Sequence, residues 1–229
     1  MYGAPELTGA TRLAAEGCAR MGAGLVTVLS MPEMAAIYRA SLPAHIMVRA
    51  DLDWVDARTT AKLYGSGGLA KPFVYDRNVK TVLDADALKN LPRTLNGHFV
   101  LTPHEGEFAR AFPHITGDRR ERALKAAQET GACVVLKGSQ TVIAAADGRV
   151  VVNDHACPYL ATAGSGDVLA GMIVGLLAQG MAPFEASCAA VWIHGACGLR
   201  FGAGLVASDL VGLIPDVLKE MLGFLGEVR

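Results

Sequence analysis

The sequence has few of the features that mark disordered, membrane-spanning or nucleic-acid-binding chains. Charged residues make up 19% of its 229 residues and hydrophobic residues 52%, which excludes a disordered chain. The sequence has 21 lysine and arginine residues and 22 acidic residues, so it has no excess of positive charge to bind a nucleic-acid backbone. The longest apolar run, residues 168–178, is too short to cross a bilayer, and no signal-peptide pattern opens the sequence. We therefore expect a packed cytoplasmic protein that binds neither nucleic acid nor membrane.

The sequence also lacks the common metal-binding and nucleotide-binding motifs. Its five cysteines are an odd number without C-x-x-C spacing, which favours buried free thiols over disulfides or a zinc site. His194 lies in a predicted apolar helix and is expected to be a core residue rather than a ligand. There is no G-x-x-x-x-G-K-[ST] motif, and no G-x-G-x-x-G motif follows the first predicted strand, so neither a P-loop nor a standard dinucleotide fold is indicated. Glycine, in contrast, is abundant at 26 residues, which indicates many tight turns and close backbone approaches.

The hydrophobic pattern predicts strands that alternate with helices. Helical spacing predicts helices over residues 8–24, 32–42, 105–112, 118–131, 165–180, 183–202 and 208–225. Apolar runs predict strands over residues 25–30, 45–50, 98–104 and 132–138. Residues 79–88 predict a buried strand that runs into a loop with two acidic residues. Residues 141–154 predict a hairpin with a type I′ turn at Asp147-Gly148, whereas residues 51–80 have no clear pattern. This order indicates a layered α/β fold with a largely parallel sheet and antiparallel strands at one edge.

The sharpest local feature is Gly164-Ser165-Gly166-Asp167, at the start of a predicted apolar helix. Glycine leaves backbone N–H groups free to face a ligand, and the N-terminus of a helix carries partial positive charge. This combination suits a phosphate group or a developing oxyanion. Asp167 in the first turn could then act as a base on a nearby hydroxyl group, or it could only cap the helix. The glycines and serine before it favour the first interpretation, because a cap requires less backbone freedom.

Three further candidate segments lie at predicted strand ends. Residues 137–141 close one strand and open the next, and they suit either a nucleotide phosphate or ribose or an ordinary β-turn. At a strand-to-helix corner, Glu107 carries oxygen atoms suited to a magnesium ion that keeps several waters, whereas Glu105 is expected to cap the helix start. Asp84 and Asp86 lie on the same side of an extended segment after another strand, and one of them could face solvent as a turn residue.

Five segments together resemble those of one protein family, the ADP-dependent NAD(P)H-hydrate dehydratases of the ribokinase-like superfamily. They occur in the family's order, at residues 9–28, 82–88, 101–110, 134–148 and 153–180. The run GSGDVLAG is shared across the superfamily, whereas LTPHEGEF and VLDADAL are typical of the dehydratases. The similarity extends over nearly all of the chain from Gly9 onward, except residues 49–80.

The resemblance implies a single ribokinase-like domain over residues 1–229, with three α/β/α layers, a mostly parallel sheet and an antiparallel hairpin at one edge. It implies a carbon–oxygen lyase that repairs the S form of hydrated NADH or NADPH. In this family ADP (ATP in eukaryotic members) phosphorylates the added hydroxyl group, and loss of phosphate restores the double bond. Such phosphoryl transfer requires an anion site, a base and a metal ion such as Mg²⁺. The resemblance further implies a homo-oligomer, such as a tetramer.

The resemblance also gives roles to particular residues. Asp167 matches the catalytic base, which also contacts the hydrated substrate, and Glu107 matches the acid of the superfamily's magnesium network. Ala10, Gly67 and His104 match substrate-binding positions. The positions that match the nucleotide site are Lys137, Gly138, Ser139, Gln140, Thr141, Gly164, Ser165 and Gly166.

The chain departs from the family pattern in two places. Members begin with a strand before the Gly-Ala pair, and we expect that strand to be missing here. Their G-P-G-L-G loop is represented only by residues 65–69. The N-terminal epimerase domain that many members carry is not expected either. Two alternative functions stay open: a kinase of the same superfamily that acts on a vitamin precursor or sugar, and a non-catalytic nucleotide-binding protein.

Overall fold

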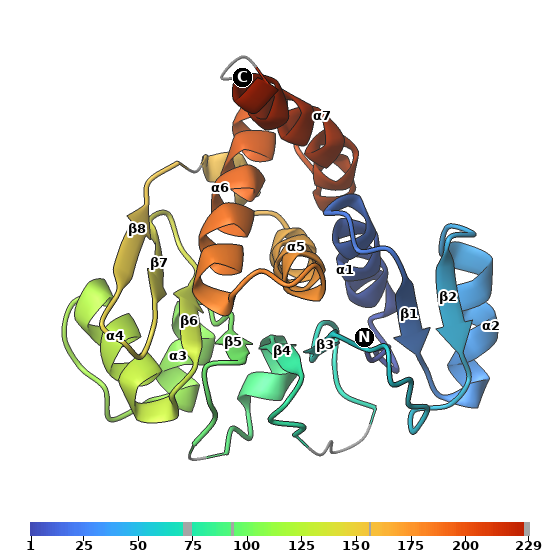
Figure 1. Ribbon diagram of the computed structural model, residues 1–229, viewed down its shortest axis with the longest axis horizontal. Helices are drawn as coiled ribbons and strands as arrows, with labels where there is room; N and C mark the ends of the chain where they lie inside the picture. The colour runs from blue at the N-terminus through green and yellow to red at the C-terminus, as the bar shows by residue number, and fades with distance from the viewer. Residues whose placement is uncertain (71–74, 93, 156, 227–229) are drawn as a thin grey trace.

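A six-stranded sheet lies at the centre of the computed structural model, which describes residues 1–70, 75–92, 94–155 and 157–226 (Figure 1). Neighbouring strands are parallel from β3 to β6, whereas β7 is antiparallel to both β6 and β8. In spatial order the strands are β3 (Ala61–Tyr64), β4 (Lys80–Leu83), β5 (Phe99–Leu101), β6 (Cys133–Leu136), β7 (Thr141–Ala144) and β8 (Val150–Asn153). The predicted parallel sheet with an antiparallel hairpin at one edge is confirmed.

Two further strands, β1 (Val26–Leu29) and β2 (Ile46–Arg49), form a separate parallel sheet beside α2 (Pro32–Ser41) (Figure 1). Tyr2 links the two sheets. It forms a parallel bridge with the last residue of β1, and its N–H donates to the carbonyl oxygen of Leu63 in β3 (3.1 Å). Beyond this bridge a cavity of about 590 Å³ lies between β1 and β3 and is lined by residues of both strands.

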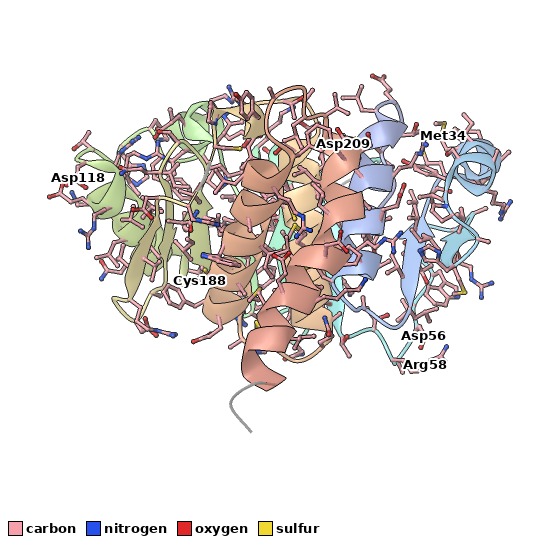
Figure 2. The ribbon with its side chains drawn as sticks, turned by 90° about the horizontal axis from the view of Figure 1, so that it is seen from above. Met34, Asp56, Arg58, Asp118, Cys188 and Asp209 are labelled. Carbon is pink, nitrogen blue, oxygen red and sulfur yellow. The ribbon has the colours of Figure 1, made fainter. Side chains whose placement is uncertain are left out.

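Helices cover both faces of the six-stranded sheet, so the fold has three layers (Figure 1). On one face α5 packs on β3 and β4, and α6 packs on β5 to β8, while α1 and α7 pack against α5. On the other face α4 packs on β6, β7 and β8. Seen from above, α2 with Met34 and α4 with Asp118 lie at opposite ends of the molecule (Figure 2). Besides α2, the helices are α1 (Thr8–Arg20), η1 (Ala85–Leu88), α3 (Glu105–Ala111), α4 (Arg119–Thr130), η2 (Pro158–Leu160), α5 (Ser165–Ala178), α6 (Pro183–Phe201) and α7 (Ala207–Gly226).

The inner strands are buried on both faces, which explains why they are apolar without alternation. Val82 and Val100 belong to the core beneath α5 and α6. Their neighbours Leu83 and Leu101 belong to the second core, beneath α3 and α4. The carboxyl ends of these strands therefore emerge between two apolar layers of packed side chains. The polar residues that follow the strands gather at this edge of the sheet.

Small residues let α1 and α5 approach each other closely. A Cβ atom at Gly175 would lie 2.7 Å from the carbonyl oxygen of Cys18, and one at Gly171 would overlap that of Ala14. The residues of α5 from Val168 to Leu177 are all buried, as expected for a helix that is apolar all round. No helix in the described part of the chain has the length and apolarity required to cross a membrane.

Two local predictions are wrong. Strand β3 lies within residues 51–80, where no strand was predicted because Ala61–Tyr64 contains no β-branched residue and leads directly into a glycine cluster. Residues 71–74 of that segment lie outside the described residues. The hairpin turn is not type I′, which requires positive φ at both central residues. Gly148 has φ +98°, but Asp147 does not have positive φ, and the N–H of Gly148 donates to the carbonyl oxygen of Ala145 (3.1 Å).

Candidate active site

The site is built around a buried carboxylate, Asp84, which directly follows β4. Its Oδ1 accepts hydrogen bonds from Thr102 Oγ1 (2.7 Å) and Lys137 Nζ (3.0 Å). Its Oδ2 accepts a hydrogen bond from Ser66 Oγ (3.1 Å). Thr102 follows β5, Lys137 follows β6 and Ser66 follows β3, so four adjacent strands each deliver a polar side chain to one point. Such convergence beyond the carboxyl ends of the strands is where open α/β sheets bind ligands.

Lys137 brings a cation into this cluster of acids. Its Nζ lies 3.0 Å from Asp84 Oδ1 and 3.9 Å from Glu107 Oε2. Burial by itself would lower the pKa of Lys137, but the carboxylates of Asp84, Glu107 and Asp167 outweigh burial and raise it. The ammonium group therefore stays charged at the pH of a cell. It can bind the oxygen atoms of a phosphate group that approaches the cluster.

The start of α5 faces the same point. Gly164 has φ +88° at the N-cap, and the N–H groups of Gly166 and Asp167 lie in the first turn, where a helix supplies no acceptor of its own. A Cβ atom at Gly166 would lie 3.3 Å from Lys137 Nζ, so the lysine ammonium lies directly beside the helix start. First-turn N–H groups, the helix dipole and a lysine together form an anion-binding site.

Asp167, in the first turn of α5, is a carboxylate whose pKa is raised by its surroundings. Burial and the negative charge of Asp84 raise the pKa of Asp167 to about 6, against the opposing effects of the Lys137 ammonium and the Ser66 hydroxyl. A general base works best when its pKa lies near the operating pH. Asp167 is therefore ionised at neutral pH and still basic enough to take a proton from a hydroxyl group held beside the anion-binding site.

His194 contacts the first residue of α5, Ser165, from the neighbouring helix α6. It is buried on α6, and its Nε2 lies 3.0 Å from Ser165 Oγ and 3.1 Å from the carbonyl oxygen of Ser165. Burial lowers the pKa of His194 to about 4, so the ring is neutral at physiological pH. The prediction of a core histidine with satisfied hydrogen bonds is confirmed.

The strand-to-helix corner places Glu107 toward the cluster and Glu105 away from it. His104, not Glu105, caps α3: its Nδ1 accepts from the N–H of Gly106 (3.0 Å) and of Glu107 (3.3 Å). The expectation that Glu105 caps the helix is wrong. Glu107 completes a capping box, since its Oε2 accepts from the N–H of His104 (2.8 Å). The ring of His104 remains 55% exposed, which leaves it accessible to a substrate.

The remaining predicted positions lie around the rim of the cluster. Gly67, with φ +80°, is packed so tightly on α1 that a Cβ atom there would lie 2.8 Å from the Cβ of Ala10. The turn that joins β6 to β7, residues 138–140, is exposed, and Thr141 Oγ1 donates to the carbonyl oxygen of Gly138 (3.2 Å). The structure thus brings the predicted base, anion-binding turn and strand-end turn to one place. The roles of these residues stay predictions.

Sequence reasoning did not identify Ser66 and Thr102, both buried and bonded to Asp84. Their signal is position alone, because each follows a short strand by one or two residues. The sequence alone did not distinguish the roles of Asp84 and Asp86. The structure separates them: Asp84 enters the cluster, whereas Asp86 forms a surface ion pair with Lys89 (2.6 Å).

The sheet order, the three layers and the glycine-rich start of α5 define a ribokinase-like α/β protein. A ribokinase-like superfamily protein of Enterococcus faecalis has the same fold. The two structures have a TM-score of 0.82 at 24% identity, over 96% of this chain and 85% of the other.

Sequence comparison narrows this class to one family. The family model described as NAD(P)H-hydrate dehydratase (Carb_kinase) matches residues 1–218, so the chain belongs to that family. It is 38% identical to the bifunctional NAD(P)H-hydrate repair enzyme Nnr of Moorella thermoacetica over 96% of this chain and 48% of the relative. The ADP/ATP-dependent NAD(P)H-hydrate dehydratase of Bacillus subtilis, co-crystallised with ATP/Mg²⁺ and soaked with CoA, has a TM-score of 0.81 and 30% identity, over 96% of this chain and 89% of that chain. This chain spans about half the length of the curated relatives it matches.

Proposed function

We propose that this chain restores NADH and NADPH from the S form of their hydrates, with ADP or ATP as the phosphoryl donor. The observation that carries the proposal is Asp167. It is a carboxylate with a pKa near 6 in the first turn of a glycine-led helix, next to Lys137. A base beside an anion-binding site is the pair of groups that phosphorylation of a hydroxyl group requires. Membership of the NAD(P)H-hydrate dehydratase family supports hydrated NADH and NADPH as the substrates.

In the proposed reaction Asp167 takes the proton of the added hydroxyl group. The hydroxyl oxygen forms a bond to the terminal phosphorus of the nucleotide while the bond to the leaving nucleotide oxygen breaks. Lys137 and the first-turn N–H groups of α5 stabilise the negative charge of the transferring group. The carbon–oxygen bond then breaks, phosphate leaves with the electron pair, and the ring loses a proton to restore the double bond.

The nucleotide is placed between the residues 137–141 turn and the start of α5. Both elements lie at the carboxyl ends of the strands, and Lys137 belongs to the first while touching the second. The hydrated ring is placed on the opposite rim, against Ala10, Gly67 and His104. This arrangement puts the added hydroxyl group between Asp167 and the terminal phosphate.

A magnesium ion fits the site only as an ion that keeps water and binds phosphate. Among the described residues there is no group of three or more His, Cys, Asp or Glu side chains that could hold a metal by themselves. Magnesium is commonly held by one or two carboxylates, several waters and substrate phosphates. Glu107 would hold it here, and a bound ion would supply charge neutralisation for the phosphate oxygens. Full activity in excess chelator would contradict this assignment.

One assay tests the function. The protein is incubated with hydrated NADH and ADP or ATP, and the return of the reduced-nicotinamide absorbance is followed. Recovery of NADH together with released phosphate supports the proposal. A stable phosphorylated product would instead support a small-molecule kinase, and tight nucleotide binding without turnover would support a non-catalytic nucleotide-binding protein.

We also propose a cytoplasmic homo-oligomer. Helices α6 and α7 expose large apolar side chains, including Trp192 (40% exposed), Leu199 (49%) and Leu222 (64%), and exposed apolar surface of this kind is typical of contacts between subunits. Light scattering after size-exclusion chromatography gives the mass. A monomeric mass at micromolar concentration would contradict this part of the proposal.

A further inference from the structure

Arg119 reaches from α4 to the base of the strand-end turn. It is the first residue of α4, next to Asp118 at the outer edge of the molecule in Figure 2. Its Nη2 donates to the carbonyl oxygens of Leu136 (3.1 Å) and Lys137 (3.2 Å), the last residue of β6 and the residue after it. A Cβ atom at Gly138 would lie 2.5 Å from the same nitrogen, so the turn rests directly on the guanidinium.

The other side of the guanidinium binds the corner that carries Glu107. Arg119 Nη1 donates to Glu105, the first residue of α3, in a hydrogen-bonded ion pair. Arg122 holds the same carboxylate with two hydrogen bonds (3.0 and 3.1 Å).

The Lys137 peptide is thereby held on both sides. Its N–H donates to the carbonyl oxygen of Pro103 (2.8 Å), directly before the α3 corner, and its carbonyl oxygen accepts from Arg119. Fixing both peptide groups sets the direction in which the Lys137 side chain leaves the backbone. That direction carries Nζ to Asp84 and to the start of α5.

We propose that Arg119 is a positioning residue, which acts through Glu105 to hold the residues 137–141 turn and Lys137 in register with Glu107 for binding a nucleoside diphosphate. This inference rests on the proposed function. A guanidinium suits the role because its planar fork can donate to two carbonyl oxygens and a carboxylate at once. A lysine ammonium at the same place would keep the charge but not this geometry.

The test compares Arg119→Met and Arg119→Lys with Arg120→Met. Arg120 is the next residue of α4, and its side chain is exposed, so it matches in charge and in helix position. We expect Arg119→Met to raise the Kd of ADP about 10-fold or more, as when charge-assisted hydrogen bonds are lost. The Kd of ADP for Arg119→Lys should lie between the values for Arg119→Met and the wild type. The Kd for Arg120→Met should stay within about 2-fold of the wild-type value. Nucleotide KM should rise more than kcat falls.

Two measurements separate positioning from support of the fold. Melting temperature without ligand reports stability, and ADP titration is done well below it. A lower melting temperature with an unchanged ADP Kd would overturn the inference. If Arg119→Met does not fold, Glu105→Gln takes its place in the test, because glutamine keeps the shape of the side chain and removes the ion pair. Glu105→Gln should raise the Kd of ADP. The increase should be smaller in the Arg119→Lys background than in the wild type.

The outcome also separates this inference from the proposed function. If the wild-type protein does not bind ADP at all, the proposed function fails. If the wild type binds ADP and the Arg119 and Glu105 variants bind it equally well, only the positioning role fails.

Discussion

Asp167→Asn is expected to stabilise the protein at pH 8 while abolishing its turnover. Burial and the charge of Asp84 raise the pKa of Asp167 from 3.8 to about 6, which means that the folded state disfavours the ionised carboxylate. Since one pKa unit corresponds to about 1.4 kcal/mol, keeping this group ionised at pH 8 lowers the free energy of unfolding by on the order of 3 kcal/mol at most. Asparagine keeps the shape and carries no charge, so it removes this penalty.

The effect of Asp167 on the free energy of unfolding depends on pH in a defined direction. Between the unfolded pKa of 3.8 and the folded pKa of about 6, the unfolded chain loses the proton of Asp167 while the folded chain keeps it. The free energy of unfolding therefore falls as pH rises through this window and is constant with respect to this group above it. The gain from Asp167→Asn should be largest at pH 8 and roughly half as large at pH 5.

Urea unfolding of the wild type and Asp167→Asn at the two pH values measures the effect, with turnover assayed in parallel. Asp86→Asn is the matched control, because Asp86 is a surface carboxylate paired with Lys89, and its change should stay within about 0.5 kcal/mol. Turnover of Asp167→Asn should fall about 10²–10⁴-fold, as for loss of a positioned base. A variant that is less stable than the wild type at pH 8, or that keeps near-normal turnover, would refute the reasoning.

Three further changes test other parts of the site. Asp84→Asn removes a like charge and should lower the pKa of Asp167, which would move the acid limb of a kcat/KM profile from near pH 6 to lower pH; an unmoved limb would contradict the coupling. His104→Ala removes the α3 cap and should lower the free energy of unfolding by about 1 kcal/mol. A rise in the KM of the hydrate with an unchanged Kd of ADP would show that His104 also contacts the substrate. Equal losses in stability, hydrate binding and ADP binding would show that His104 acts only as the helix cap. Gly171→Ala should lower the melting temperature because its Cβ would overlap a carbonyl oxygen of α1, whereas Gly212→Ala, in open space on α7, should be neutral or stabilising by calorimetry.

The convergence of the site could be predicted from the sequence because parallel strands end at one edge of a sheet. Lys137 follows one apolar run and Asp167 begins an apolar helix, so both were expected beyond the carboxyl ends of the strands. The order of strands and helices was predictable for the same reason. Strand β3 was not predictable, since Ala61–Tyr64 contains no β-branched residue and leads directly into a glycine cluster.

Local chemistry does not decide which of two neighbouring polar residues turns inward. Glu105 and His104 both suit the start of α3, and the choice between them depends on Arg119 and Arg122, which lie on another helix. Asp84 and Asp86 are likewise separated by the backbone at Ala85, whose φ is +43°. These contacts arise only when α3, α4 and the sheet are packed together.

The charges of the site explain why stability and the proposed catalysis make opposing demands on Asp167. Three carboxylates, Asp84, Glu107 and Asp167, surround the single ammonium of Lys137, so the cluster has an excess of negative charge. Burial, together with that excess of negative charge, raises the pKa of Asp167 into the range useful to a base. The same negative charge repels the phosphates that the helix start attracts. A cation bound together with the nucleotide would offset this repulsion between the carboxylates and the phosphates. The site is therefore expected to bind free ADP less tightly than ADP with magnesium.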